Sequence, residues 1–187
     1  MALCSVLLLQ ARSPTARAEA LLRAGLAKLD ITTTKPVTMS GYESRKGLSE
    51  GVHDPLSARA VALEHNGQRL VLVSTDVIGF YNDTAEPLRK AILEACRLEA
   101  SELFLTAIHT HSAPALALDP GKGHSNNVEY TQGLRTQLVR LAEAALGNLR
   151  PVEVSVGAGS SQVGANRREV VKEGTGQIGR ASCRERV

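Results

Sequence analysis

Aromatic side chains are scarce in this chain of 187 residues: Phe, Tyr and Trp together make up 3%, and Trp does not occur. Proteins that bind single-stranded nucleic acid usually stack its bases on exposed aromatic rings. The net charge of +3 does not supply a basic surface instead, since residues 178–187 alone hold three arginines against one glutamate. The composition argues against nucleic-acid binding, and we expect no nucleic-acid partner.

Cysteine is nearly absent as well. The three cysteines are Cys4, Cys96 and Cys183, and no two of them form a C-x-x-C pair. We expect the first and last to lie outside the folded domain, which leaves Cys96 as a single buried thiol. A disulfide framework and a thiolate zinc site are therefore excluded. No apolar run approaches the ~20 residues that cross a bilayer, so we expect no transmembrane span.

The two ends differ from the rest of the chain. Residues 1–18 resemble the end of a secretory signal, with an apolar run over 2–9 and a small-x-small cleavage pattern in Ala16-Arg17-Ala18. This predicts export to an extracellular or periplasmic location; the alternative is a frayed N-terminal segment. Residues 178–187 read as the translation of a common sequencing adapter, ATC GGA AGA GCG TCG TGT AGG GAA AGA GTG. We interpret them as a non-native tail and expect the natural protein to continue beyond residue 177.

Alternating and helical patterns between these ends predict several secondary-structure elements. Asn66-Gly67 between two apolar runs predicts a hairpin turn. Asp83-Thr84-Ala85-Glu86 has the pattern of a capping box that opens a helix, with Pro87 in its first turn. The predicted strands are 24–32, 56–64, 69–74, 102–108 and 152–157; the predicted helices begin at 83 and 128, and the longest loops are 39–55 and 113–127.

The order strand, hairpin, helix, strand, helix, strand favours an α/β fold. We predict a mixed β-sheet with flanking helices, formed by residues 19–177 as part of a larger catalytic domain. The strand 69–74 is apolar on both faces, so we expect it in the middle of the sheet.

Two histidines follow the predicted strand 102–108 directly. His109 and His111 are two residues apart, and in an extended chain such residues point to the same face. Neutral imidazole is a good zinc ligand, so the pair indicates part of a metal site, although two ligands cannot complete a tetrahedral one. Two unrelated surface histidines remain the alternative. Several hydrolase classes use H-x-H, phosphoesterases among them, but Ala113 and Pro114 do not fit the metallo-β-lactamase pattern.

Several stretches in the same order, covering about residues 23–170, resemble the N-terminal domain of the neutral/alkaline, non-lysosomal ceramidases. The matching stretches are GLAKLDIT (25–32), MSGY (39–42), GVH (51–53), ARA (58–60), LVSTD (72–76), AIHTHSAP (107–114) and NRR (166–168). Ile108 and Ala113 depart from the Thr and Gly that the family usually has there, which indicates a divergent branch.

The resemblance implies a zinc-dependent amidohydrolase in which one Zn²⁺ activates a water that cleaves ceramide, or a related lipid-like amide or ester. By position, His109 is similar to the first zinc ligand, and His111 to a histidine that contacts substrate or polarises the amide oxygen. Arg167 is similar to an active-site arginine, with Arg168 as the alternative. The family's other ligands, a His, a Glu and a Tyr, lie far downstream, so we expect the chain by itself to be an inactive fragment.

Two further residues carry two interpretations each. Asp76 follows a predicted central strand and either orients a ligand histidine or caps the next turn. His53, in the loop 39–55, either lines the pocket or is solvated. We interpret the remaining polar residues of interest as structural: His65, His124 and Arg59.

Overall fold

The computed structural model describes residues 21–42, 44–161, 168–171 and 174–177. The expected signal-like segment 1–18, the expected tail 178–187 and Arg167 lie outside the described residues. The chain divides into two compact units, Met1–Glu153 and Val154–Val187. In the second unit, β6 (Arg168–Val171) and β7 (Gly174–Gln177) form an antiparallel pair.

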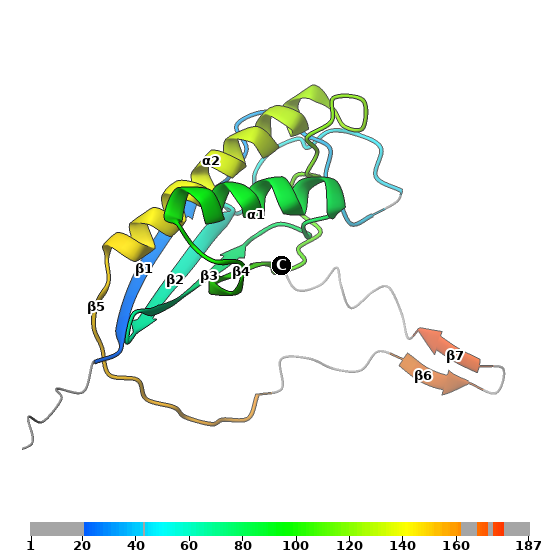
Figure 1. Ribbon diagram of the computed structural model, residues 1–187. Helices are drawn as coiled ribbons and strands as arrows, with labels where there is room; N and C mark the ends of the chain where they lie inside the picture. The colour runs from blue at the N-terminus through cyan, green and yellow to red at the C-terminus, as the bar shows by residue number, and fades with distance from the viewer. Residues whose placement is uncertain (1–20, 43, 162–167, 172–173, 178–187) are drawn as a thin grey trace, which may run out of the picture. The chain divides into compact units, whose positions relative to one another are not determined.

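The first unit is a five-stranded mixed sheet with two helices, which confirms the predicted α/β class (Figure 1). The strand order is β4-β3-β2-β1-β5; β3 and β4 are parallel and the other pairs are antiparallel. The elements are β1 (Arg23–Asp30), β2 (Ser57–His65), β3 (Gln68–Thr75), α1 (Asn82–Cys96), a 3-10 turn (Ala100–Glu102), β4 (Leu103–Ala107), α2 (Ser125–Gly147) and β5 (Arg150–Pro151).

The predicted hairpin is confirmed. His65 pairs with Gln68, and the two residues between them, Asn66 and Gly67, have φ of 53° and 79°. Two positive φ values define the type I′ turn, whose twist matches that of the strands it joins. The following strand, β3, lies between β2 and β4, as predicted for a central strand.

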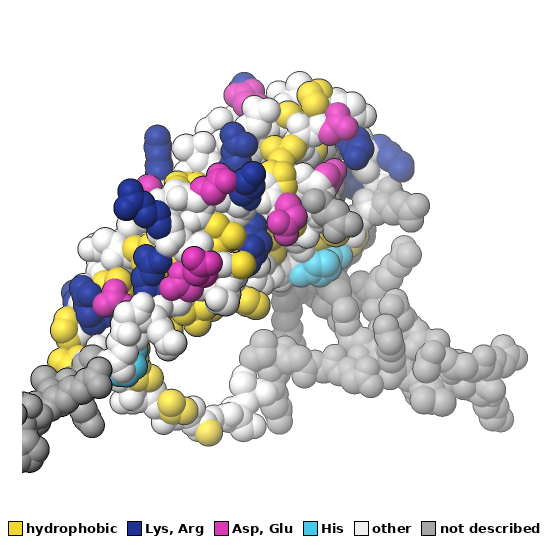
Figure 2. Space-filling view, viewed as in Figure 1, with side chains coloured by type: hydrophobic (Ala, Val, Ile, Leu, Met, Phe, Trp, Pro, Cys, Tyr) yellow, Lys and Arg dark blue, Asp and Glu magenta, His cyan; other side chains and the backbone are white. Residues whose placement is uncertain are grey.

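Both helices pack on the same face of the sheet (Figure 1). Alternate strand residues point to this face, and α2 meets them with leucines and alanines spaced three or four apart. Burying each leucine contributes roughly 1.5–3 kcal/mol. The shared core includes Ala58, Ala60, Ala62, Val71, Val73, Leu88, Ile92, Leu134, Leu138, Leu141 and Ala145. Acidic and basic side chains are interspersed on the solvent side of the helices (Figure 2).

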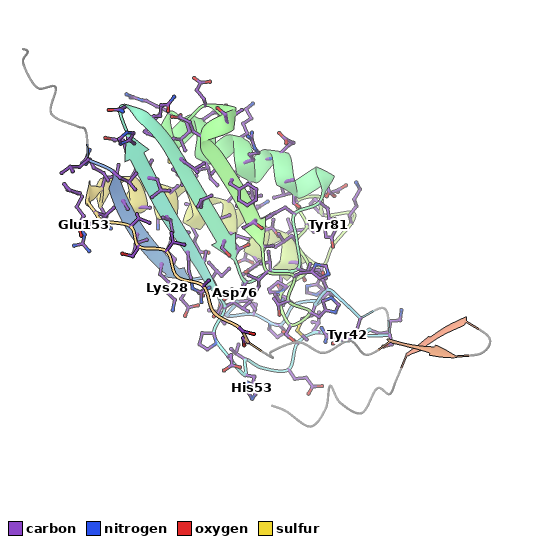
Figure 3. All side chains as sticks on the ribbon, turned by 90° about the horizontal axis from the view of Figure 1, so that it is seen from below. Lys28, Tyr42, His53, Asp76, Tyr81 and Glu153 are labelled. Atoms are coloured by element: carbon purple, nitrogen blue, oxygen red, sulfur yellow. The ribbon has the colours of Figure 1, made fainter. Side chains whose placement is uncertain are left out.

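The opposite face of the sheet is not covered by either helix (Figure 3). Side chains that share a register position run across four strands there: Leu26 pairs with Val61, Val61 with Leu72, and Leu72 with Phe104. Leu26 and Phe104 are 64% and 59% exposed. The apolar pattern of these strands therefore continues on a face that the first unit's helices leave open.

The start of α1 differs from the prediction. The cap residue is Tyr81, and Thr84, not Glu86, closes the turn: its hydroxyl accepts from the Tyr81 N–H (3.2 Å) and donates to the Tyr81 carbonyl (3.2 Å). Thr84 is fully buried, so its hydroxyl satisfies these backbone groups away from water. Since α1 begins at Asn82, Pro87 lies in its second turn and not in the first.

Two other boundaries were wrong. Helix α2 begins at Ser125, inside the predicted loop, because the His124 ring nitrogen Nδ1 accepts from the Asn126 N–H (3.2 Å) and caps the first turn. The predicted strand 152–157 is not formed. Strand β5 is Arg150–Pro151, since β1 offers it only Arg23 and Ala24 as partners.

Among the described residues, no helix is both long enough and apolar enough to cross a lipid bilayer. Cys96 is the one free cysteine among them and is buried, as expected; burial raises the pKa of its thiol.

At Gly25, the backbone of β1 packs closely against the backbone at the end of α2. A Cβ at this position would lie 2.0 Å from the Ala145 carbonyl oxygen and 2.9 Å from the backbone of Asn148 and Leu149. Because backbone cannot turn aside as a side chain can, we predict that Gly25→Ala lowers the free energy of unfolding by about 3 kcal/mol, the upper part of the range for overpacking. Urea unfolding measures it.

Gly133, within α2, is the matched control. A Cβ there meets nothing within 4 Å. Gly133→Ala should raise the free energy of unfolding by about 0.5–1 kcal/mol, since alanine favours the helix. Equal effects of the two substitutions would contradict the close packing at Gly25.

Candidate functional site

The carboxyl ends of the parallel strands β3 and β4 meet at one edge of the sheet. Thr75 pairs with Ala107, and two backbone hydrogen bonds join the residues after β4 to the end of β3 and the residues that follow it. The Ile108 N–H donates to the Thr75 carbonyl (3.1 Å) and the His109 N–H to the Val77 carbonyl (3.2 Å). Ligand sites of open α/β sheets form outside such strand ends.

His109 is held by its backbone and by its ring. Its φ is +64°, in the left-handed region, so the chain is not extended at this residue as the sequence interpretation assumed. Its Nδ1 lies 2.8 Å from the Ile78 carbonyl oxygen. A carbonyl only accepts, so this hydrogen bond requires a proton on Nδ1; in the neutral ring the Nε2 lone pair is then free. That is the tautomer in which a histidine binds a metal through Nε2.

His111 lies beside His109 despite the turn between them. The two ring centroids are 5.2 Å apart, with the planes at 71°, so the imidazoles share one side of this loop. His111 is half-buried, whereas His109 is exposed. On its other side, the His111 ring meets the Tyr42 ring edge to face, at 5.1 Å and 80°.

A pocket of about 430 Å³ opens beside His109, between β4 and α1. Its walls combine apolar side chains with nearly as much polar surface, and Arg89 of α1 is the charged residue in them. The other lining residues include Ile78, Phe80, Leu105 and Ala107. Imidazole and apolar surface thus border the same hollow.

The hydrogen bonds of the Asp76 carboxylate go to β2. The Ser57 N–H and hydroxyl both donate to it at 2.9 Å, and Arg59 forms an ion pair with it at 3.2 Å. Burial raises the pKa of Asp76, but the hydrogen bonds from Ser57 and the charge of Arg59 outweigh it and hold this pKa below its usual value. Asp76 thus ties the end of β3 to the start of β2, and Arg59 is an ion-pair residue, as expected.

The other histidines lie apart from this pair. His53 is in the loop that precedes β2, with its side chain 78% exposed and paired with Asp54 (Figure 3). His65 is exposed at the hairpin, beside Asn66 (2.9 Å), and His124 caps α2. Arg168 begins β6 in the second unit, and Arg167 is outside the described residues.

Within the described part of the chain, no three His, Cys, Asp or Glu side chains come together as a group able to hold a metal ion. His109 offers one prepared donor there, and a tetrahedral zinc site needs four. Any complete site requires donors from other residues.

Sequence reasoning did not find the residues that surround His111. Gly41, Tyr42 and Arg45 all touch it, from about 70 positions earlier in the chain. Two signals were available: their place in a long glycine-containing loop, which is often functional, and, for Gly41 and Tyr42, the stretch MSGY (39–42) that resembles the ceramidases.

No family model and no curated protein matches the sequence. Solved structures do match, among them neutral ceramidase from Pseudomonas aeruginosa, at 27% identity and a TM-score of 0.59, and a ceramidase described as complexed with C2, at 26% identity and a TM-score of 0.55. The chain has a ceramidase-like fold. In both cases the match covers 71% of this chain and 22% of the other, so the ceramidase-like part spans less than a quarter of those proteins.

The contacts of Asp76 predict a pH-dependent contribution to stability. Asp76→Asn removes a charge that accepts three hydrogen bonds, and we expect it to cost about 1–3 kcal/mol at pH 7. Since the pKa of Asp76 is lower in the folded state than the usual 3.8, the contribution is fully present above about pH 5 and is lost as the pH falls through the folded-state pKa. Thermal unfolding of both proteins from pH 7 to pH 2 measures the difference.

Asp54→Asn is the control, because the Asp54 side chain is 86% exposed and its partner is the exposed His53. It should leave the stability unchanged at every pH. A difference between Asp76→Asn and the parent that does not shrink at all as the pH falls from 5 to 2 would show that the substitution acts by other means than the charge.

Proposed function

We propose that this chain is the N-terminal part of an exported, zinc-dependent amide hydrolase of neutral ceramidase type. The reaction is hydrolysis of an N-acylsphingosine, or a related lipid amide, to the amine and a fatty acid. One observation carries the proposal: in a ceramidase-like fold, His109 presents a free Nε2 beside His111 at the ends of two parallel strands. We assign residues 1–18 to the export signal, 19–177 to the catalytic domain and 178–187 to a non-native tail.

Among the described residues, His109 fits one of the four ligand positions of a tetrahedral zinc site. The Ile78 carbonyl fixes the His109 tautomer, as backbone carbonyls do for many metal-binding histidines. Zinc, when bound, supplies the Lewis acidity that makes a water nucleophilic near neutral pH. The other ligands belong to sequence beyond residue 177 in this proposal.

His111 and Arg167 are assigned to the substrate. His111 lies next to His109, where a protonated ring nitrogen can donate to the amide oxygen as negative charge develops on it. Arg167 is assigned to the active site from its similarity to the ceramidase arginine, with Arg168 as the alternative. His53 and Asp76 receive no direct role, since the first is solvated and the second is bound to β2.

The pocket beside His109 supports an apolar substrate. A long alkyl chain gains free energy wherever it leaves water for apolar surface, by about 0.8 kcal/mol for each CH₂ that is buried. Phe80, Leu105 and Ala107 provide such surface next to the histidine. A substrate with a lipid tail and a scissile amide fits this combination.

The direct test uses the natural protein, including the sequence that follows residue 177, with short-chain ceramide as substrate and fatty-acid release as readout. We expect hydrolysis that a zinc chelator abolishes and added zinc restores. His109→Ala should reduce kcat/KM by more than about 100-fold, the upper limit seen when only a group that orients a ligand is lost. His65→Ala, at the exposed hairpin, should have no effect.

If the protein hydrolyses a phosphodiester but no amide, it belongs to another class of H-x-H hydrolase, the phosphoesterases. Full amide hydrolysis by His109→Ala would refute the proposal.

The proposal also predicts how the present chain handles zinc. Residues 19–177 supply two ligands at most, so the purified segment should bind zinc weakly and lose it on dialysis. Metal analysis measures the zinc content. A stoichiometric zinc ion retained after dialysis would show that the site is complete within this segment.

A further inference from the structure

The segment before β2 lies against the segment that carries the histidines. Two backbone hydrogen bonds join them: the Ser40 N–H donates to the Ala113 carbonyl (3.3 Å) and the Ala115 N–H to the Thr38 carbonyl (2.9 Å). Met39 and Pro114 form an isolated antiparallel bridge between the two. This pairing brings Gly41, Tyr42 and Arg45, which follow it, against His111.

Because Gly41 has no side chain, the His111 ring can occupy the space beside it. Its φ is +104°, which L side chains rarely adopt. A Cβ at this position would lie 2.3 Å from Cγ and 2.7 Å from Nδ1 of His111. A side chain larger than hydrogen at position 41 is therefore incompatible with the present position of the ring.

Arg45 contacts the backbone of His111 and also the ring of Tyr42, which packs against His111. Its Nη1 donates to the His111 carbonyl at 2.9 Å, and its guanidinium carbon lies 5.0 Å from the centre of the Tyr42 ring. Tyr42 in turn meets the His111 ring at 5.1 Å. One arginine thus contacts the His111 backbone directly and the His111 ring through Tyr42.

We propose that Gly41, Tyr42 and Arg45 are positioning residues, a clamp that sets where the His111 imidazole stands relative to His109. The inference rests on the proposed function for its consequence, since positioning matters when His111 meets substrate. A planar guanidinium can donate to a carbonyl and stack on an aromatic ring at the same time, which a lysine ammonium cannot do with the same geometry. Misplacing a reacting group by 1 Å can cost about 100-fold in rate.

The test of the clamp needs no metal and no substrate. In the chain as it stands, NMR cross-peaks between the Tyr42 and His111 ring protons report their contact directly. We expect Arg45→Ala to weaken these cross-peaks at least threefold, and Arg45→Lys to give intermediate intensity. Arg135→Ala, which removes an exposed arginine of α2, should leave them unchanged.

The melting temperature separates positioning from unfolding. Arg45 lies in a surface loop outside the core, so Arg45→Ala should shift the melting temperature by no more than about 4 °C, the effect of 1 kcal/mol in a domain of this size. Tyr42→Leu is a second variant: it removes the ring that links Arg45 to His111, and the His111 ring resonances should move as they do in Arg45→Ala. Parental cross-peaks in Arg45→Ala, or an equal loss in Arg135→Ala, overturn the clamp.

Kinetics of the longer protein separate this inference from the proposed function. With ceramide hydrolysis established, Arg45→Ala should lower kcat about 10–100-fold with little change in KM, and Arg45→Lys should restore part of it. A full kcat in Arg45→Ala refutes the positioning role and leaves the hydrolase standing. Lost cross-peaks in a protein without amidase activity support the clamp and refute the hydrolase.

Discussion

The parallel pairing of β3 with β4 is the constraint on which the candidate site depends. It brings Thr75 and Ala107 to the same edge of the sheet, and the two residues after β4, Ile108 and His109, donate backbone hydrogen bonds to Thr75 and Val77. The pairing is in turn fixed by the core, because shifting β4 by one residue would turn Leu103 out of the core and Phe104 into it. The site is thus a consequence of the hydrophobic register of the sheet.

The sequence predicted those parts of the fold whose cause is local. The turn at Asn66-Gly67 needs a positive φ at two adjacent positions, which these residue types favour. The spacing of the leucines in α2 follows from the helical repeat and predicts the helix itself. The sequence did not predict what depends on distant partners. The length of β5 follows from where β1 begins. The cap of α1 depends on the burial of Thr84, whose hydroxyl bonds the Tyr81 backbone in place of the capping box predicted from Asp83 and Glu86.

The same division holds within the site. Residue type and position after a strand pointed to His109 and His111, but the assumed extended geometry was wrong: His109 itself is left-handed, and the two rings approach each other across the turn. The contacts of Arg45 and Gly41 join segments about 70 residues apart, so no periodicity or spacing reveals them. Asp76 had two interpretations from sequence, and its partners on β2 became visible only with the sheet register.

A left-handed conformation at a residue other than glycine costs about 1–3 kcal/mol and persists where its surroundings over-determine it. At His109 they do so twice: Val77 accepts from the backbone N–H, and Ile78 accepts from the ring. Both acceptors follow β3 and do not depend on any residue beyond the described sheet. The histidine is therefore oriented by the sheet alone, and any ligand that binds its Nε2 would not have to order this side chain, which lowers the entropic cost of binding.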